Sequence, residues 1–297
     1  MFWIELKKIL KVSPLFIFLA APLVFAGQDE VRPLFKQKPE LILSEDMEGV
    51  KNLSGVAWLP EEGHYLFSSS KPAALHEIAV LGSRARKVRT IKLKEFKSVS
   101  AVAYVGRAEA GSEGDRIAIA EEGKAEVSFC DITERQGELK RSQCKTYKID
   151  HLMFWEKRFG IKGLAVNRES DVPVFYFGKE KMPKEIFRGF FEDGQWHMQT
   201  AWDAESMMPT ESVISDLFYD NSLFVLDGAG ARVLQMDSLT GQTVSEFHIK
   251  KEPKSGLSGF CLARQTDGTQ AALASNKNRY FIYNIPDKSA SSEKEEL

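Results

Sequence analysis

Histidine and cysteine are scarce in this sequence, which contains five His and three Cys among 297 residues. The chain also lacks the strings HExxH, CxxC, GxSxG and GxxxxGK followed by Ser or Thr. Those strings accompany zinc proteases, thiol redox centres, serine hydrolases and P-loop nucleotide sites. None of these four kinds of active site is therefore indicated.

An excess of basic residues is also missing. Lys and Arg number 40 against 42 Asp and Glu, which gives a formal net charge of -2. Binding to nucleic acid needs many positive charges that neutralise phosphates, so we expect no nucleic-acid partner. Hydrophobic residues make up 43% of the chain and aromatic residues 11%. This composition argues against disorder and favours a folded chain rich in β-strands.

The N-terminal apolar run is too short for an ordinary membrane span. Residues 1–11 include three lysines, residues 12–25 are uncharged and almost wholly apolar, and a small-residue pattern ends at Ala26. This order is typical of a secretory signal peptide, whereas a transmembrane helix needs roughly 20 apolar residues. We expect residues 1–26 to direct export and the protein to be periplasmic or secreted. The alternative is an uncleaved segment that anchors the protein to the cell membrane, as its only membrane contact.

Two of the three cysteines are placed for a disulfide, which an oxidising compartment would allow. Cys130 and Cys144 are equidistant from Gly137, and a hairpin that turns there would set them on facing strands. We predict a Cys130–Cys144 disulfide, with two buried, unpaired thiols as the alternative. Cys261 lies in the apolar run GFCLA and is expected to be a packed free thiol.

A repeat of short strands runs along the chain. Five units open with a small or polar residue followed by mostly apolar ones, at 54–58, 100–104, 162–166, 215–219 and 258–262. Further short strands follow each opening strand, usually four strands per unit, and turn residues separate them. Four short antiparallel strands per unit are typical of the blade of a β-propeller. The alternative to five blades is a degenerate sixth blade between residues 100 and 162.

The last unit has three strands, and an isolated strand at residues 40–44 precedes the first unit. We expect this strand to complete the last blade and so to cover an open sheet edge. The predicted organisation is an all-β, five-bladed propeller of four-stranded antiparallel blades over residues 40–286. A linker at 27–39 precedes the propeller and a disordered tail at 287–297 follows it.

Three segments resemble the SdiA-regulated family of YjiK-type bacterial propellers. They are SKPAA at 70–74, GIKGLA at 160–165 and FGKEKMP at 177–183. The resemblance extends over nearly the whole chain that follows residue 26. It implies a five-bladed propeller distantly similar to NHL-repeat proteins, a location in the periplasm or cell envelope, and an association with calcium, with no established reaction.

The start of a blade's first strand lies beside the end of its second strand in an antiparallel pair. Side chains at these positions should therefore ring one end of the central channel, and we call this set the predicted mouth. It is the expected site for a ligand or a partner. Its members are Ser54, Ser70, Ser100, Glu122, Lys162, Glu180, Ser215, Asp227, Ser258 and Asn276.

The chain departs from the family within the predicted mouth. Members commonly carry Glu in the opening strands, where this chain has Ser100, Lys162 and Ser258. Calcium prefers roughly six to eight oxygen ligands, and the remaining metal candidates are only Glu122, Glu180 and Asp227. Calcium thus follows from the resemblance alone, and its site is expected to be degraded. We hypothesise that Lys162 acts as a built-in cation that pairs with Glu122 or Glu180; the alternative is a solvated Lys162.

Together these features predict an exported, non-catalytic, monomeric propeller that binds a small ligand or an envelope protein at the predicted mouth. The alternative is a metal-dependent hydrolase of the propeller type, acting on lactones or phosphoesters. The five histidines do not fall at the positions of the predicted mouth, and no catalytic residue is assigned.

Overall fold

The computed structural model describes residues 33–34, 38–108, 113–149, 160–249, 256–265 and 268–286. The predicted export segment at 1–26 and the predicted tail at 287–297 lie outside these residues. Within the described part of the chain, no helix is both long and apolar enough to span a membrane.

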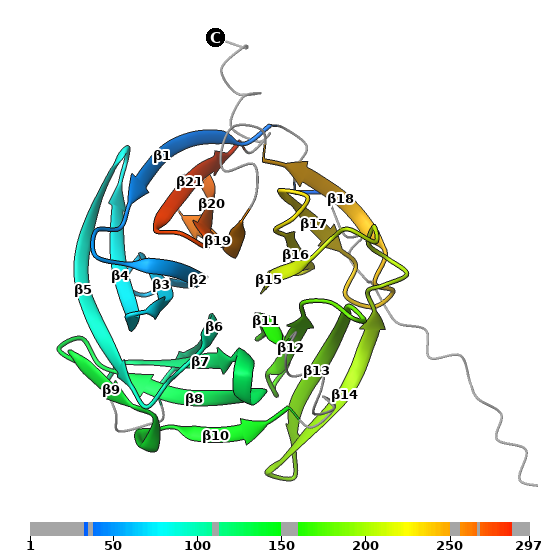
Figure 1. Ribbon diagram of the computed structural model, residues 1–297, viewed down its shortest axis with the longest axis horizontal. Coiled ribbons are helices and arrows are strands. Elements are labelled where there is room, and N and C mark those ends of the chain that lie inside the picture. The colour runs from blue at the N-terminus through cyan, green and yellow to red at the C-terminus, as the bar shows by residue number, and fades with distance from the viewer. Residues whose placement is uncertain are drawn as a thin grey trace, which may run out of the picture. The chain divides into compact units, whose positions relative to one another are not determined.

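The strands form five antiparallel blades around a central axis, as the repeat predicts (Figure 1). Blade 1 contains β2 (Lys51–Leu59), β3 (His64–Lys71), β4 (Ala73–Leu81) and β5 (Arg84–Lys94). Blade 2 contains β6 (Val99–Arg107), β7 (Asp115–Glu121), β8 (Glu126–Ile132) and β10 (Lys145–Lys148). Blade 3 contains β11 (Ile161–Asn167), β12 (Val174–Lys179), β13 (Glu185–Glu192) and β14 (Gln195–Asp203). Blade 4 contains β15 (Ile214–Tyr219), β16 (Leu223–Asp227), β17 (Arg232–Met236) and β18 (Thr243–His248).

Blade 5 is closed by the first strand of the chain. It contains β19 (Leu257–Gln265), β20 (Gly268–Ser275) and β21 (Arg279–Ile285), and β1 (Glu40–Asp46) pairs antiparallel with β21. An ion pair joins Asp46 to Arg279 at 2.6 Å, and Tyr280 donates to Glu45 at 2.9 Å. The predicted closure by residues 40–44 is therefore confirmed, and β1 covers the edge that β21 would otherwise expose.

The Cys130–Cys144 disulfide is present, with the two Cα atoms 4.6 Å apart. The intervening chain is not the simple hairpin at Gly137 that the sequence suggested. An additional short strand, β9 (Glu138–Lys140), lies between β8 and β10 in the sequence. It pairs in parallel with the outer strand β5 of blade 1 rather than with a strand of blade 2. The described residues between 100 and 162 thus form blade 2 and this extra strand rather than a sixth blade. Cys261 is free and buried, as predicted.

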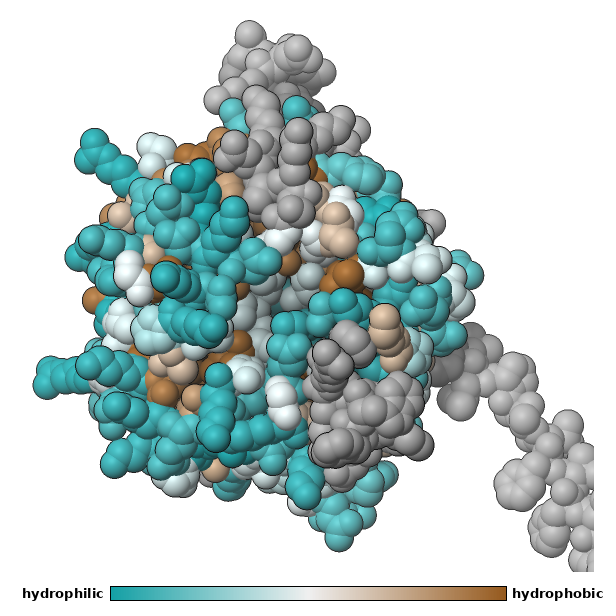
Figure 2. All heavy atoms as spheres, in the orientation of Figure 1, coloured by the Kyte–Doolittle hydropathy of each residue, from teal (hydrophilic) through white to brown (hydrophobic). Residues whose placement is uncertain are grey.

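Alternating side chains fill the space between blades. Five buried hydrophobic clusters lie one at each junction between neighbouring blades. At the junction of blades 2 and 3, Phe129, Phe175 and Trp196 pack ring against ring, with centroids 4.8–5.9 Å apart. These junctions fix the blades relative to one another and hold the inner strands around the axis (Figure 1). The face shown in Figure 2 is mostly hydrophilic, with hydrophobic residues in separate small patches.

Candidate functional site

The five inner strands converge at the second residue of each repeat. These residues are Gly55, Ala101, Gly163, Asp216 and Gly259. A Cβ atom added at Gly55 would lie 2.9 Å from the Cα of Ala101, and one added at Gly259 would lie 2.9 Å from the Cα of Gly55. Because neighbouring backbones approach this closely, larger side chains cannot be accommodated at the two glycines.

Asp216 is the exception, and its carboxylate fills the axis at this level. It accepts hydrogen bonds from the backbone N–H groups of Leu217 at 2.9 Å, Phe260 at 2.9 Å and Leu164 at 3.4 Å, and from that of Val56. The donors belong to four blades, and Asp216 is fully buried. Burial raises the pKa of Asp216 well above its ordinary value, while the four N–H donors oppose that rise. This axial carboxylate separates the two ends of the channel.

At one end, the structure forms the ion pair that we hypothesised within the predicted mouth. The Nζ atom of Lys162 lies 2.7 Å from Oε2 of Glu122, and both side chains are partly exposed. Glu180 instead lies near Lys181, with N and O atoms 3.9 Å apart. Lys162 therefore neutralises Glu122 rather than pointing freely into solvent.

Four of the five serines of the predicted mouth bond to the protein's own groups. Each inner strand has a β-bulge at the first residue of the repeat, where the strand register shifts. The hydroxyls of Ser100, Ser215 and Ser258 donate to nearby backbone carbonyls. The hydroxyl of Ser54 lies 3.1 Å from that of Ser68. Ser70 is half-buried and Asn276 is exposed. A polar residue recurs at the bulge because its hydroxyl can satisfy local backbone groups.

Asp227 does not face the predicted mouth. It is fully buried and accepts from Ser212 at 2.8 Å, Arg232 at 3.0 Å, Gly230 N–H at 3.0 Å and Val213 N–H at 3.1 Å. Burial opposes ionisation of Asp227, but these hydrogen bonds outweigh it and hold its pKa below the ordinary value. The carboxylate is thus committed to the fold of blade 4.

The three predicted metal candidates therefore do not fit a calcium ion. Asp227 is saturated by hydrogen bonds and Glu122 is neutralised by Lys162. No group of three or more His, Cys, Asp or Glu among the described residues could hold a metal. Calcium needs several convergent oxygens, which the described residues at this end of the channel do not supply.

Exchange of Lys162 for glutamate tests the conclusion that Lys162 neutralises Glu122 and that the predicted mouth does not bind calcium. The wild-type melting temperature should be the same in millimolar calcium and in chelator. Lys162→Glu should melt about 2–4 °C lower in chelator, because two facing carboxylates repel and cost about 1 kcal/mol. Calcium should restore part of that loss, and Lys162→Gln should not respond to calcium. A calcium-dependent rise in the wild type would contradict the assignment.

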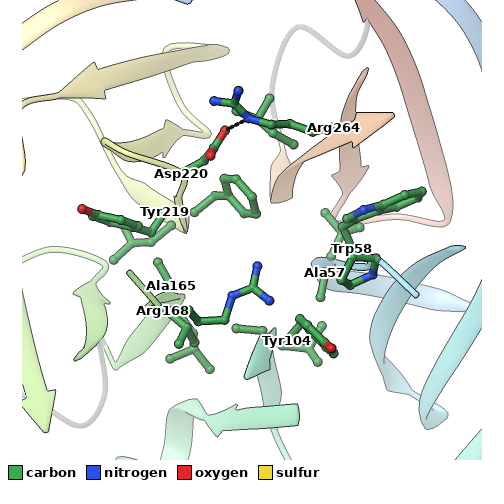
Figure 3. Close-up of a pocket in the computed structure, with 17 residues that line it drawn as sticks. Ala57, Trp58, Tyr104, Ala165, Arg168, Tyr219, Asp220 and Arg264 are labelled. Atoms are coloured by element: carbon green, nitrogen blue, oxygen red, sulfur yellow. Dashed lines mark hydrogen bonds and ion pairs between the residues drawn. The ribbon is translucent and has the colours of Figure 1, made fainter. Parts of the chain in front are cut away.

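The opposite end of the channel holds a cavity of about 180 Å³, which we call the Arg168 pocket. The blades run in opposite rotational order in Figures 1 and 3, so the two figures view the propeller from opposite faces. The floor, next to Asp216, includes Val56, Leu164 and Leu217, three of the residues whose N–H groups bond to that carboxylate. Their side chains pack into the hydrophobic clusters between blades. The axial carboxylate therefore holds the floor of the pocket in place.

Aromatic residues form the walls of the Arg168 pocket. Trp58, Tyr104 and Tyr219 each occupy the fifth residue of a repeat, and Phe218 precedes Tyr219. Trp58 and Tyr219 lie on opposite sides of the pocket in Figure 3. Burial raises the pKa of Tyr104 and raises that of Tyr219 to about 12, so both phenols are neutral at physiological pH. The sequence prediction missed this site, although the recurring aromatic fifth residue was a signal for it.

Arg168 extends from the end of β11 over the middle of the pocket (Figure 3). Its guanidinium carbon lies 4.9 Å from the centroid of the Tyr104 ring, within the range of a cation–π contact. The other charged lining residues, Asp220 and Arg264, pair with each other at 2.8 Å. The neighbouring Glu169 accepts from the Tyr219 hydroxyl at 3.2 Å and the Asn221 N–H at 3.0 Å. Among the residues that the structure describes, no carboxylate forms an ion pair with Arg168.

Comparison with known proteins supports the assignment of the fold. A sequence model of the SdiA-regulated family matches residues 36–268. A gluconolactonase from Xanthomonas campestris is 10% identical with a TM-score of 0.50, over 84% of this chain and 95% of that one. A luciferin-regenerating enzyme is 10% identical with a TM-score of 0.52, over 83% of this chain and 95% of that one. At this identity the two structures share a fold with this chain, and the likeness does not extend to their reactions.

Proposed function

The chain belongs to the SdiA-regulated family, and from this premise we propose that it is an exported propeller that binds a small ligand in the Arg168 pocket without transforming it. Export is supported by the Cys130–Cys144 disulfide, which is typical of oxidising compartments. It is also supported by the signal-like segment at residues 1–26. The proposed location is the periplasm or the exterior, with the protein as a monomer.

One observation carries the binding proposal: a guanidinium that no carboxylate among the described residues pairs with lies in a concave site lined by aromatic residues. Ligand sites are typically apolar clefts with a few polar groups that orient the ligand. Arg168 supplies such a group, and Trp58, Tyr104 and Tyr219 contribute aromatic surface to the lining. The predicted mouth offers less, because four of its five serines and Glu122 are already paired within the protein.

The chemistry of the lining favours binding over hydrolysis. None of the residues that line the Arg168 pocket, all of them described, is a Ser, Cys, His or Lys. Asp220 is the lining carboxylate, and its pairing with Arg264 leaves it poorly placed to act as a base. The phenols of Tyr104 and Tyr219 have raised pKa values and so are poor nucleophiles. The lining therefore provides orientation and contact area but no activated nucleophile.

A ligand-observed NMR screen of small ring compounds tests the proposal. Compounds that bind should compete with one another and should change the fluorescence of Trp58. Trp58→Leu should weaken their binding at least tenfold, because base-sized rings gain about 1–3 kcal/mol from stacking on an aromatic side chain. Trp196→Phe, in the outer strand β14 and packed at the junction of blades 2 and 3, serves as a matched control for loss of an indole. If binding is lost in Lys162→Gln and kept in Trp58→Leu, the ligand binds at the predicted mouth and the proposal is wrong.

A further inference from the structure

We infer that the ligand of the Arg168 pocket is a small carboxylate that carries a planar ring. This inference rests on the proposed function and adds the chemical class of the ligand. It draws on three properties of the pocket: a positive charge that no carboxylate among the described residues pairs with, the volume of the cavity, and the aromatic residues of its lining.

The charges favour an anion. Of the three charged lining residues, Asp220 and Arg264 neutralise each other, which leaves the positive charge of Arg168. Glu169 is directed to Tyr219 and Asn221 by two hydrogen bonds. A guanidinium binds a carboxylate through two parallel N–H···O bonds, which are stronger than hydrogen bonds between neutral groups. Arg168 is exposed and reaches over the middle of the pocket, so such a contact needs no rearrangement of the blades.

A cationic ligand is disfavoured by the same arrangement. Aromatic-walled sites often bind ammonium groups through the faces of their rings. Here the guanidinium of Arg168 already lies over the Tyr104 ring. A second cation between these walls would be repelled by Arg168 at close range.

The volume of the cavity accommodates one ring. The cavity measures about 180 Å³, and an apolar protein cavity of about 150 Å³ holds one benzene molecule. A benzoate-sized compound therefore fits with its ring inside and its carboxylate at the level of Arg168. Aromatic residues from three blades, Trp58, Tyr104 and Tyr219, contribute to the lining around that ring.

Calorimetric titration of the full chain with four probes tests the inference. The probes are benzoate, benzamide, benzylammonium and acetate. Benzoate should bind at least tenfold more tightly than benzamide, because a charge-assisted hydrogen bond replaces a neutral one. Benzylammonium and acetate should bind at least tenfold more weakly than benzoate, because the first carries the wrong charge and the second has no ring.

Arginine variants complete the test. Arg168→Gln should reduce the affinity for benzoate at least tenfold, so that benzoate binds no more tightly than benzamide. Arg168→Lys should retain part of the preference for benzoate over benzamide. Arg84→Gln, in the exposed outer strand β5, is the matched control and should bind like the wild type. Equal binding of benzoate and benzamide, tightest binding of benzylammonium, or an unchanged Arg168→Gln would overturn the inference and leave the proposed function standing. Failure of every ring compound to bind would overturn both.

Discussion

Replacement of Asp216 with alanine is expected to lower the free energy of unfolding by about 3–5 kcal/mol. The substitution removes the acceptor of four backbone N–H groups that come from four different blades. Each buried donor that is left without a partner costs about 1–3 kcal/mol, and water that enters the space would recover part of the loss. Urea denaturation followed by circular dichroism measures the change.

Two further variants keep this prediction testable if Asp216→Ala does not fold. Asp216→Asn retains an acceptor oxygen but places an amide donor against backbone donors, so an intermediate loss is expected. Asp237→Ala is the matched control. Asp237 also accepts from backbone N–H groups, those of Leu239 and Thr240, but it lies in a partly exposed turn, so the loss should be about 1 kcal/mol or less. Equal losses in Asp216→Asn and Asp237→Ala would contradict the axial role of Asp216.

Removal of the Cys130–Cys144 disulfide has the second largest expected effect. Replacement of both cysteines with serine should cost about 3 kcal/mol, the value expected for a closed loop of about 15 residues. The sequence separation here is 14 residues. The loop carries β9, which pairs with β5 of blade 1, so loss of the disulfide should also weaken that contact between blades. Urea denaturation with and without reductant measures the loss.

The double serine variant supplies its own control. Reductant should destabilise the wild type to the level of the double variant and should leave the double variant unchanged. Cys261 is buried and unpaired in both proteins, so it should not add a response to reductant. A wild type that is equally stable in oxidant and reductant would contradict the role assigned to the disulfide.

The blades could be predicted from sequence because their signal is local. Inner strands are mostly apolar because successive side chains pack into the clusters on either side of the blade, as Ala101, Val102 and Ala103 do. Turn residues separate each strand from the next, so the repeat indicated five blades and their closure by residues 40–44. The strand β9 could not be predicted in this way. It spans only Glu138–Lys140 and pairs with residues 92–94, far back in the chain, so no local periodicity marks it.

The candidate site could be predicted only in part. The antiparallel order of the strands placed Lys162 and Glu122 at the same end of the channel. Lys162 lies in blade 3 and Glu122 follows β7 of blade 2, so their pairing depends on how these blades meet. The Arg168 pocket was missed because Trp58 and Tyr104 in strands are equally consistent with an ordinary core. Arg168 lies just beyond the repeat, so its position over the Tyr104 ring depends on how blades 2 and 3 meet. Asp216 was noted in the repeat, but its four donors come from strands that are distant in sequence.

The central claim is that this propeller binds its ligand at the Arg168 end of the channel. Crystals soaked with 4-bromobenzoate, with data collected at the bromine absorption edge, test the claim most directly. We expect an anomalous peak between Trp58 and Tyr219, with the carboxylate against Arg168. A peak beside Glu122 and Lys162 at the other end, with none in the Arg168 pocket, would contradict it.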